Sequence, residues 1–400
     1  MAERSGSKRT LACILVGLGA LLLVAAILIP TYTVSRLAKT PLDLEVTTVA
    51  PSPKSEVLDS RSLTAPTGAA VVDKDVPIVS QRFLTVEDPS DSKKMTIQMG
   101  QTLRRTDKQG DTGLLTAIVD RVTIDRKTGE PTDDPIGSIQ LQSDKPGQEV
   151  SHTGLQYRFP FDTEKKTYPF FDVNARQSFP MDFVDEQEIN GQKVYHFHQK
   201  TPIVDLSKVV NLPTNKLSLP ADKWGVPGGA EPVTMTRWYQ NERDYYIEPK
   251  TGVVIRGREQ VHQFYARSAD KPEVTVLKAD FDTDQNTINF QLKEAKDGID
   301  KLSLYGRIIP IILGILGALS LLAGLALGFL GGRRKTASAS GYGSLPPEPT
   351  TGTARVSDTP GNRDWTTDKT EVIDTNKSSG RDWTTDKTEE FPRVRPEDEK

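Results

Sequence analysis

Two long uncharged runs dominate the pattern of hydrophobic and polar positions along the chain. The second run, Ile308–Leu330, has 23 residues and is followed at once by Arg333, Arg334 and Lys335. As a helix with a rise of about 1.5 Å per residue it would be about 34 Å long, enough to cross a hydrocarbon core of about 30 Å. A buried core helix is the alternative, but such helices are rarely this long or this free of polar residues. We therefore predict a membrane span whose basic flank lies in the cytoplasm.

The first run, Leu11–Ile29, is also uncharged and follows Arg4, Lys8 and Arg9. A cleaved signal peptide is its main rival, but the apolar part of a signal peptide usually has about 7–15 residues. This run has 19 residues, so we predict an uncleaved anchor. Basic residues flank the cytoplasmic side of both runs. The expected protein is therefore a two-pass protein of the cell membrane, with both termini in the cytoplasm and residues 31–307 outside it.

Small residues recur within the second run. Gly324 and Gly328 are four positions apart, a spacing that places both on one helix face. Small residues let helices approach closely in lipid, so the two spans are expected to pack on each other or on a second copy of the chain. Ordinary tolerance of glycine in membrane helices is the alternative. A homo-oligomer formed through the Gly324/Gly328 face is one partner hypothesis.

The segment between the runs reads mostly as β-strands. Asn190-Gly191 lies between two alternating stretches, and Asn-Gly is the strongest short hairpin signal. Gly129 and Gly252 each follow a Lys-Thr pair, as expected for a type I turn closed by a left-handed glycine. The last three strands are expected to form a meander. The expected strands are Val46–Val49, Val71–Val79, Lys94–Met99, Leu114–Ile124, Ser138–Gln142, Glu186–Ile189, Lys193–His198, Arg237–Ile247, Val253–Tyr265 and Val274–Phe281.

A helical pattern precedes the second run. Apolar residues recur there at spacings of four and three, with Asn286 or Thr287 as the expected N-cap. We interpret residues 286–307 as a helical stalk that holds the outer domain on the membrane, and Val34 and Leu37 are expected to pack against it. The residues of the stripe are Ile288, Leu292, Ala295, Ile299 and Leu302.

The expected fold class is α+β, with a mostly β extracytoplasmic domain of antiparallel sheets or a barrel-like form, flanked by two transmembrane helices. A disordered tail is expected to follow, because its composition cannot bury enough apolar surface to fold. The expected order is a cytoplasmic N-terminus (1–10), a first span (11–30), the β-rich domain (31–285), the stalk (286–307), a second span (308–330) and the cytoplasmic tail (331–400).

Aromatic residues are concentrated in one part of the β-rich region. Ten of the 27 aromatic residues fall within 157–197. They either fill the core of a sheet or line an apolar groove that accepts a lipid chain, and both arrangements need an inward apolar face. The candidate lining residues are Tyr157, Phe159, Phe161, Phe170, Phe171, Tyr195 and Phe197.

The tail contains a short duplication. Arg-Asp-Trp-Thr-Thr-Asp-Lys-Thr-Glu occurs at 363–371 and again at 381–389. The two copies either dock a cytoplasmic partner or are a duplication without a partner. Phosphorylation would add charge to the motif. The candidate docking and phosphorylation residues are Trp365, Thr366, Thr367, Trp383, Thr384 and Thr385.

The remaining composition excludes several classes of function. The net charge of −3 gives no reason to expect a nucleic-acid partner, and Cys13 is the single cysteine, so no disulfide can form within the chain. His196 and His198 share one face of a strand, but no third metal ligand is identifiable, and a solvated strand face is the simpler interpretation. The chain has no nucleophile elbow, phosphate-binding loop or dinucleotide fingerprint. We therefore expect no enzyme, catalytic residue, cofactor or metal.

Three segments carry a resemblance to a known family. They are 116–129 (Thr-Ala-Ile-Val-Asp-Arg-Val-Thr-Ile-Asp-Arg-Lys-Thr-Gly), 154–168 (Gly-Leu-Gln-Tyr-Arg-Phe-Pro-Phe-Asp-Thr-Glu-Lys-Lys-Thr-Tyr) and 246–254 (Tyr-Ile-Glu-Pro-Lys-Thr-Gly-Val-Val). With the two apolar runs, they make residues 8–335 resemble the actinobacterial PorA-like family, built on a domain of unknown function in mycolate-bearing bacteria. The resemblance implies a cell-envelope protein, and the family has no agreed catalytic residues. Its name implies a porin, but two helices enclose a pore only if several copies assemble.

The layout of two spans around a large β-rich outer domain also looks like that of class B scavenger receptors, which carry lipid through a tunnel. This is an analogy at the level of the fold alone. The leading functional hypothesis is an envelope protein whose outer domain binds or transfers an apolar ligand, such as a mycolate-type lipid. The alternatives are a structural or signalling scaffold that recruits a cytoplasmic partner through the tail, and an oligomeric porin-like channel.

Overall fold

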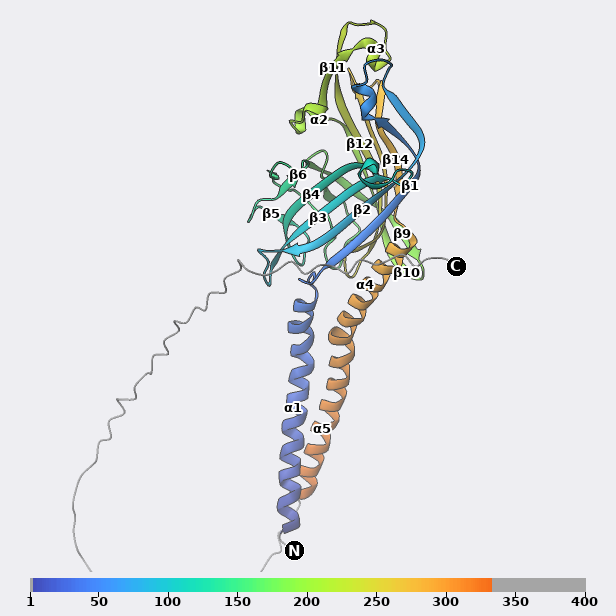
Figure 1. Ribbon diagram of the computed structural model, residues 1–400. Helices are drawn as coiled ribbons and strands as arrows, with labels where there is room; N and C mark the ends of the chain where they lie inside the picture. The colour runs from blue at the N-terminus through green and yellow to red at the C-terminus, as the bar shows by residue number, and fades with distance from the viewer. Residues whose placement is uncertain (1–2, 333–400) are drawn as a thin grey trace, which may run out of the picture. The chain divides into compact units, whose positions relative to one another are not determined.

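The computed structural model describes residues 3–332, which form a β-sheet domain with long helices at both ends (Figure 1). The expected tail and its duplicated motif lie outside the described residues. The helices are α1 (Glu3–Leu37), α2 (Leu206–Val209), α3 (Ala221–Trp224), α4 (Gln285–Ser303) and α5 (Ile309–Gly332). The strands are β1 (Glu45–Asp59), β2 (Val71–Glu87), β3 (Lys94–Arg105), β4 (Leu114–Asp125), β5 (Pro131–Thr132), β6 (Ser138–Gln140), β7 (Gln148–Glu149), β8 (Tyr168–Asp172), β9 (Gln177–Ile189), β10 (Gln192–Asp205), β11 (Lys216–Pro220), β12 (Pro232–Glu248), β13 (Val253–Ala266) and β14 (Val274–Asp282).

The strands belong to one antiparallel sheet, which confirms the mostly β domain. Their order is β7-β6-β4-β3-β2-β1-β14-β13-β12-β10-β9-β8, with β11 paired to β12 and β5 to β4. The predicted meander is confirmed, because β12 pairs with β13 and β13 pairs with β14. The first and last long strands of the domain, β1 and β14, are neighbours. The chain therefore enters and leaves the sheet at its middle.

The three predicted turns are confirmed. Asn190 and Gly191 both have positive φ, 50° and 82°, as a two-residue hairpin loop of the primed type requires. Gly129 and Gly252 both have φ of 72°. At Gly252 the backbone also approaches another segment closely, because the Gly252 carbonyl accepts a hydrogen bond of 3.1 Å from the backbone N–H of Phe159.

Strand β1 is much longer than predicted. The expected strand ended at Val49, before Pro51 and Pro53, whereas β1 continues to Asp59. Its register with β2 shifts between Ser52 and Ser55. Such irregularities let an extended strand accommodate residues that cannot donate to the sheet ladder.

The two ends of the sheet order meet. The backbone N–H of Phe171 on β8 donates to the carbonyl of Leu155 at 2.7 Å, and the N–H of Leu155 donates to the carbonyl of Pro169 at 2.8 Å. Phe171 also packs with Ile118 of β4 and Ile139 of β6 in one buried cluster. The sheet is therefore rolled so that its opposite edges approach each other, which creates an interior.

Helix α4 contains the predicted apolar stripe, but the predicted N-cap is wrong. Asp284 caps the helix, and its carboxylate accepts a hydrogen bond of 2.8 Å from the backbone N–H of Thr287. The hydroxyl of Thr287 instead accepts from the backbone N–H of Val49 on β1 at 3.1 Å. Aspartate is a stronger cap than threonine and, unlike asparagine, carries a negative charge that the positive end of the helix dipole favours. A π-helical turn, Leu304–Ile308, joins α4 to α5.

Helices α1 and α5 pack along each other, as predicted (Figure 1). The hydroxyl of Ser320 donates to the carbonyl of Leu15 at 2.9 Å. A Cβ added at Gly324 would lie 2.8 Å from the backbone nitrogen of Val16, so glycine allows this close contact. No atom of the described residues lies within 4 Å of a Cβ built at Gly328.

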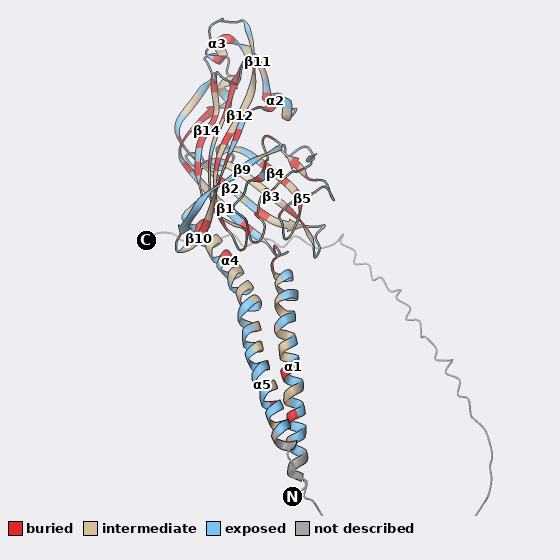
Figure 2. Cartoon of the chain, turned by 180° about the vertical axis from the view of Figure 1, so that it is seen from behind, coloured by how far each residue is buried: buried red, intermediate tan, exposed pale blue. Residues whose placement is uncertain are grey.

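The outer faces of α1 and α5 are apolar and exposed (Figure 2). Both helices are long and apolar enough to cross a membrane. The exposed residues include Leu21, Ile27, Ile315, Leu322 and Phe329. Monomeric soluble proteins rarely expose apolar patches this large, which makes these helices membrane-span candidates.

Candidate functional site

A cavity of about 1250 Å³ lies inside the rolled sheet. Side chains from β1–β4 line one wall, and side chains from β12–β14 line the other. Helix α4 and the end of α1 border it as well. The cavity exists because alternate residues of each strand point inward, while the two walls stand too far apart for these side chains to fill the space.

The residues that line the cavity extend from the helices to the end of the domain that carries α3 and β11. Figure 1 shows these two ends of the domain. Leu37 of α1 and Leu302 of α4 line one end, and Leu219 of β11 lines the other. Val253 and Tyr265 both line it and are twelve residues apart on β13. At about 3.3 Å per residue this spacing gives the cavity a length of roughly 40 Å.

Most of the wall is apolar, but a charged network crosses the middle. The Arg82 guanidinium on β2 donates to the Glu259 carboxylate on β13 at 2.8 Å. Arg243 of β12 donates to the other Glu259 oxygen at 3.3 Å and to Asp172 at 2.7 Å. The network therefore holds two guanidinium groups and two carboxylates, and its charges balance.

Neutral donors complete this network. Tyr245 donates to Glu259 at 2.9 Å, and Tyr239 donates to Asp172 at 2.7 Å. Burial alone would raise the pKa of Glu259, but Arg82 and Arg243 outweigh it and hold this pKa well below its ordinary value of 4.5. Burial raises the pKa of Tyr245 to about 12, and the Glu259 charge adds to the rise. Glu259 is therefore ionised and Tyr245 is neutral at physiological pH.

A second buried polar cluster surrounds Asp120 of β4. Its carboxylate accepts from the Tyr157 hydroxyl and from Gln156 Nε2, the latter at 2.6 Å. The other carboxylate oxygen lies 2.9 Å from His152 Nε2, and His152 Nδ1 lies 2.9 Å from the carbonyl of Val150. Both ring nitrogens of His152 thus face oxygen atoms. Gln156 and Tyr157 bring this cluster to the cavity wall.

Four buried polar atoms of cavity-lining residues have no hydrogen-bond partner within the described residues. They are Gln156 Oε1, Arg158 Nε, Arg237 Nε and Asn241 Oδ1. Asn241 is only 2% exposed. Buried polar atoms normally pair, so the wall holds polar groups whose hydrogen bonds are not all satisfied within the described residues.

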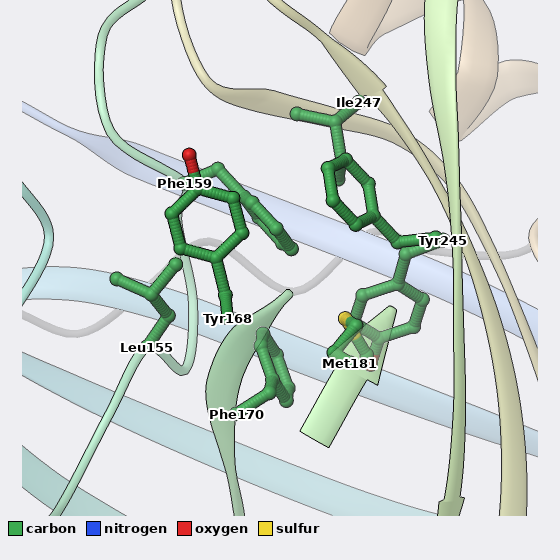
Figure 3. Packing of buried hydrophobic residues seen from close by; sticks show 8 residues of the cluster. Leu155, Phe159, Tyr168, Phe170, Met181, Tyr245 and Ile247 are labelled. Carbon is green, nitrogen blue, oxygen red and sulfur yellow. The ribbon is translucent and has the colours of Figure 1, made fainter. Parts of the chain in front are cut away.

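The structure separates the predicted aromatic residues into two groups. Phe159 and Phe197 lie in a packed cluster with their ring centroids 5.0 Å apart, and Tyr195 packs against the edge of that cluster. Figure 3 shows Phe159 in this cluster beside Leu155 and Tyr168. None of these three lines the cavity, whereas the other four do. The lining members are Tyr157, Phe161, Phe170 and Phe171. Solid core and cavity wall therefore meet within one aromatic region.

The two strand histidines contact carboxylates on the outside of the sheet. His196 Nε2 and His198 Nδ1 lie 2.8 and 3.0 Å from the same oxygen of Asp244. The His196 ring also stacks on Tyr246 at 4.8 Å between centroids. Among the described residues, no group of three or more histidine, cysteine, aspartate or glutamate side chains is arranged to hold a metal ion.

The charged network is not among the features predicted from the sequence. A signal for it exists in β12, where the inward positions Tyr239, Asn241, Arg243 and Tyr245 alternate with outward ones. A charged residue in an inward series must find a buried partner. The pattern does not say that the partner is Glu259, which follows sixteen residues later on β13.

Comparisons with known proteins identify the family. A family model described as Porin PorA matches residues 11–326. Porin PorA of Corynebacterium amycolatum is 32% identical over 382 residues, which cover 80% of this chain and 98% of that protein. Porin PorA of Corynebacterium resistens is 31% identical over 398 residues, which cover 80% of this chain and 96% of that protein.

The chain belongs to the PorA family. The matched region contains most of both apolar helices, the whole sheet and every residue that lines the cavity. The resemblance inferred from three sequence segments is thus confirmed. The PorA-family relatives and the two apolar helices indicate a protein of the membrane or cell envelope.

Proposed function

We propose that this PorA-family protein binds a long apolar ligand, of the class of envelope lipids, in the cavity of its β-domain. The observation that carries the proposal is a cavity of about 1250 Å³ with mostly apolar walls along the strands. Ligand pockets usually have volumes of about 300–1,000 Å³. Protein interiors otherwise pack densely, with few voids larger than a water molecule. A void of this size and lining favours a ligand.

We further propose that α1 and α5 anchor the protein as a two-pass membrane protein with both termini in the cytoplasm. Their exposed apolar faces and mutual packing support membrane insertion. Basic residues at both cytoplasmic flanks, among them Arg9 and Arg333, support the orientation. The cavity end beside Leu37 and Leu302 would then lie next to the membrane.

Native mass spectrometry of the full-length protein, purified from a mycolate-bearing host, tests ligand binding. The expected spectrum contains protein with one bound lipid, and delipidated protein should take up lipid from vesicles. Ala50→Trp fills the cavity at an inward-facing position of β1 and should reduce uptake. Ala69→Trp adds the same side chain at an exposed position that does not line the cavity, and it should bind like the wild type. Protein that carries no lipid and takes up none would contradict the proposal.

A second candidate function is a pore, and the names of the relatives favour it. Both relatives are called Porin PorA. Two helices enclose no channel, so a pore formed by this chain requires several copies side by side. The open face at Gly328 is available for such contacts. Purified full-length protein should then produce discrete conductance steps in planar bilayers, and silent bilayers across repeated preparations would count against a pore.

A further inference from the structure

Five cationic side chains line the end of the cavity beside the helices. They come from α1, the α1–β1 connection, the β4–β5 turn, the segment before β8 and α4. These elements are distant in the sequence but converge where the chain passes from the helices to the sheet. The five residues are Arg36, Lys39, Arg126, Arg158 and Lys301.

None of the five forms an ion pair with a carboxylate of the described residues. Lys39 donates to the carbonyl of Ser92 at 2.6 Å, and Arg126 Nε donates to the carbonyl of Thr40 at 2.8 Å. Arg158 donates to the carbonyl of Thr251 at 2.8 Å. Backbone carbonyls orient these three cations, and Glu248 and Glu294 act on Arg158 only from beyond ion-pair distance. The arginines of the central network, in contrast, are each paired with a carboxylate.

Two carboxylates, Glu294 and Asp297 of α4, line the cavity as well. With the buried Glu248, whose charge acts on Arg158, five cations face three anions, so this end of the cavity carries an excess of positive charge. The residues lie beside the last turns of α1 and α4, which end at Leu37 and Ser303. The positive charge thus lies at the junction of the β-domain with the apolar helices.

Arg158 is partly buried and lies against the ring of Phe161, with 5.0 Å between the guanidinium carbon and the ring centroid. Burial lowers the pKa of Arg158 to about 10, so the side chain is still cationic at neutral pH. This guanidinium lines the cavity, donates to a backbone carbonyl and has no carboxylate within ion-pair distance among the described residues. It is therefore suited to pair with an anion that enters the cavity.

We propose that these five cations form a head-group site for a lipid with an anionic head, whose chain occupies the apolar cavity above it. The occupant is a long-chain lipid with a carboxylate or phosphate head. This inference rests on the proposed function, because it assumes that the cavity holds a lipid, and it adds the chemical class of the head group. Guanidinium groups suit the site, since they pair bidentately with either anion.

Binding of a fluorescent long-chain fatty acid and of its methyl ester tests the head-group site. Both probes have the same chain, and only the acid carries a negative charge. The protein is used at full length in nanodiscs of a zwitterionic lipid. We expect the acid to bind about tenfold more tightly than the ester, the effect of one charge-assisted hydrogen bond.

Substitutions at the cationic residues test whether these side chains cause the preference for the acid. Arg158→Gln should remove most of the preference for the acid and leave the affinity for the ester unchanged. The unchanged ester affinity would show that the cavity is intact in this variant. Lys301→Gln is a second variant, at an exposed position where the substitution does not disturb buried packing. It should lower the affinity for the acid by a smaller factor than Arg158→Gln does. Arg267→Gln is the matched control, because Arg267 does not line the cavity and is paired with Glu273.

The outcomes separate the two proposals. Equal affinities for acid and ester in the wild type would overturn the head-group site and leave the proposed function standing. An acid preference that persists in both Arg158→Gln and Lys301→Gln would also overturn it. Absence of binding by both probes would overturn the proposed function itself. A preference lost in Arg158→Gln and kept in Arg267→Gln supports the site.

Discussion

Arg82 of β2 and Glu259 of β13 form an ion pair across the cavity, with 2.8 Å between the guanidinium and the carboxylate. Strands β1 and β14 stand between β2 and β13 in the sheet order. In a flat sheet, three strand spacings would separate the two backbones by about 14 Å. The contact therefore depends on the long arginine side chain and on the curl of the sheet, and it ties the two walls together.

Removing one partner of this ion pair should destabilise the β-domain. Glu259→Gln leaves Arg82 and Arg243 facing a neutral group, and breaking a buried pair costs about 3 kcal/mol or more. We expect the unfolding temperature of the protein in nanodiscs to fall by about 6–12 °C. Asp280→Asn is the control, because its pair with Arg258 is about half exposed and contributes at most about 1 kcal/mol. Equal shifts in the two variants would contradict the structural role of the network.

The same carboxylate predicts an acid-dependent loss of stability. The pKa of Glu259 is lower in the folded protein than its ordinary value of 4.5. Below about pH 4.5 the unfolded chain binds a proton at this position and the folded protein does not, so stability falls as the pH is lowered.

Comparison of the wild type with Glu259→Gln isolates this effect. The stability difference between them should shrink by up to about 1.4 kcal/mol per pH unit below pH 4.5, because the glutamine cannot titrate. Unfolding temperatures measured from pH 7 to pH 3 check the prediction. A difference that stays constant over this range would show that Glu259 is not held ionised.

Gly252 and Gly191 should respond differently to alanine. Both residues have positive φ, so alanine costs about 1 kcal/mol at each. A Cβ at Gly252 would also collide with the carbonyl oxygen of Phe159, whereas at Gly191 it would meet no atom within 4 Å. We expect Gly252→Ala to cost about 1–3 kcal/mol more than Gly191→Ala in thermal unfolding. Similar costs would argue against the close approach of the two segments.

Gly324 and Gly328 should also differ. Gly324→Leu places a side chain against Val16 of α1 and should separate the two apolar helices, which lowers the unfolding temperature. Gly328→Leu faces open space and should leave that temperature unchanged. If copies of the chain associate through Gly328, this second variant should lower the oligomeric state seen by native mass spectrometry. An unchanged oligomeric state in Gly328→Leu would exclude that face as the contact.

Deletion of residues 336–400 distinguishes a lipid carrier from a scaffold that acts through its tail. The residues that line the cavity extend from Arg36 to Leu302, so we expect the shortened protein to retain lipid uptake. Uptake from vesicles, followed by native mass spectrometry, measures this. Docking of a partner by Trp365 and Trp383 predicts instead that the deletion abolishes co-purification of that partner. Loss of lipid uptake in the shortened protein would contradict the prediction that the cavity binds lipid without the tail.

Local sequence patterns determined the individual elements of this protein. The Asn190-Gly191 hairpin could be predicted because two residues with positive φ need such side chains. The stripe from Ile288 to Leu302 identified α4, since its period is that of a helix. Both signals depend on residues within a few positions of each other. Pro51 misled the prediction because an irregularity in a long-range strand pairing, and not the local sequence, decides whether β1 continues.

Tertiary structure alone decided whether an inward-facing side chain packs in the core or lines the cavity. Phe159 and Phe161 alternate along the chain as two residues on one strand face would, but both lie in the irregular segment between β7 and β8. Phe159 packs in the core there, and Phe161 lines the cavity. Alternation predicts a shared face only within a strand, and the curl of the whole sheet decides which contacts such a segment makes. The same curl brings Arg82 to Glu259 and gathers five cations from separate elements. Such contacts join residues far apart in the chain, and no local pattern encodes them.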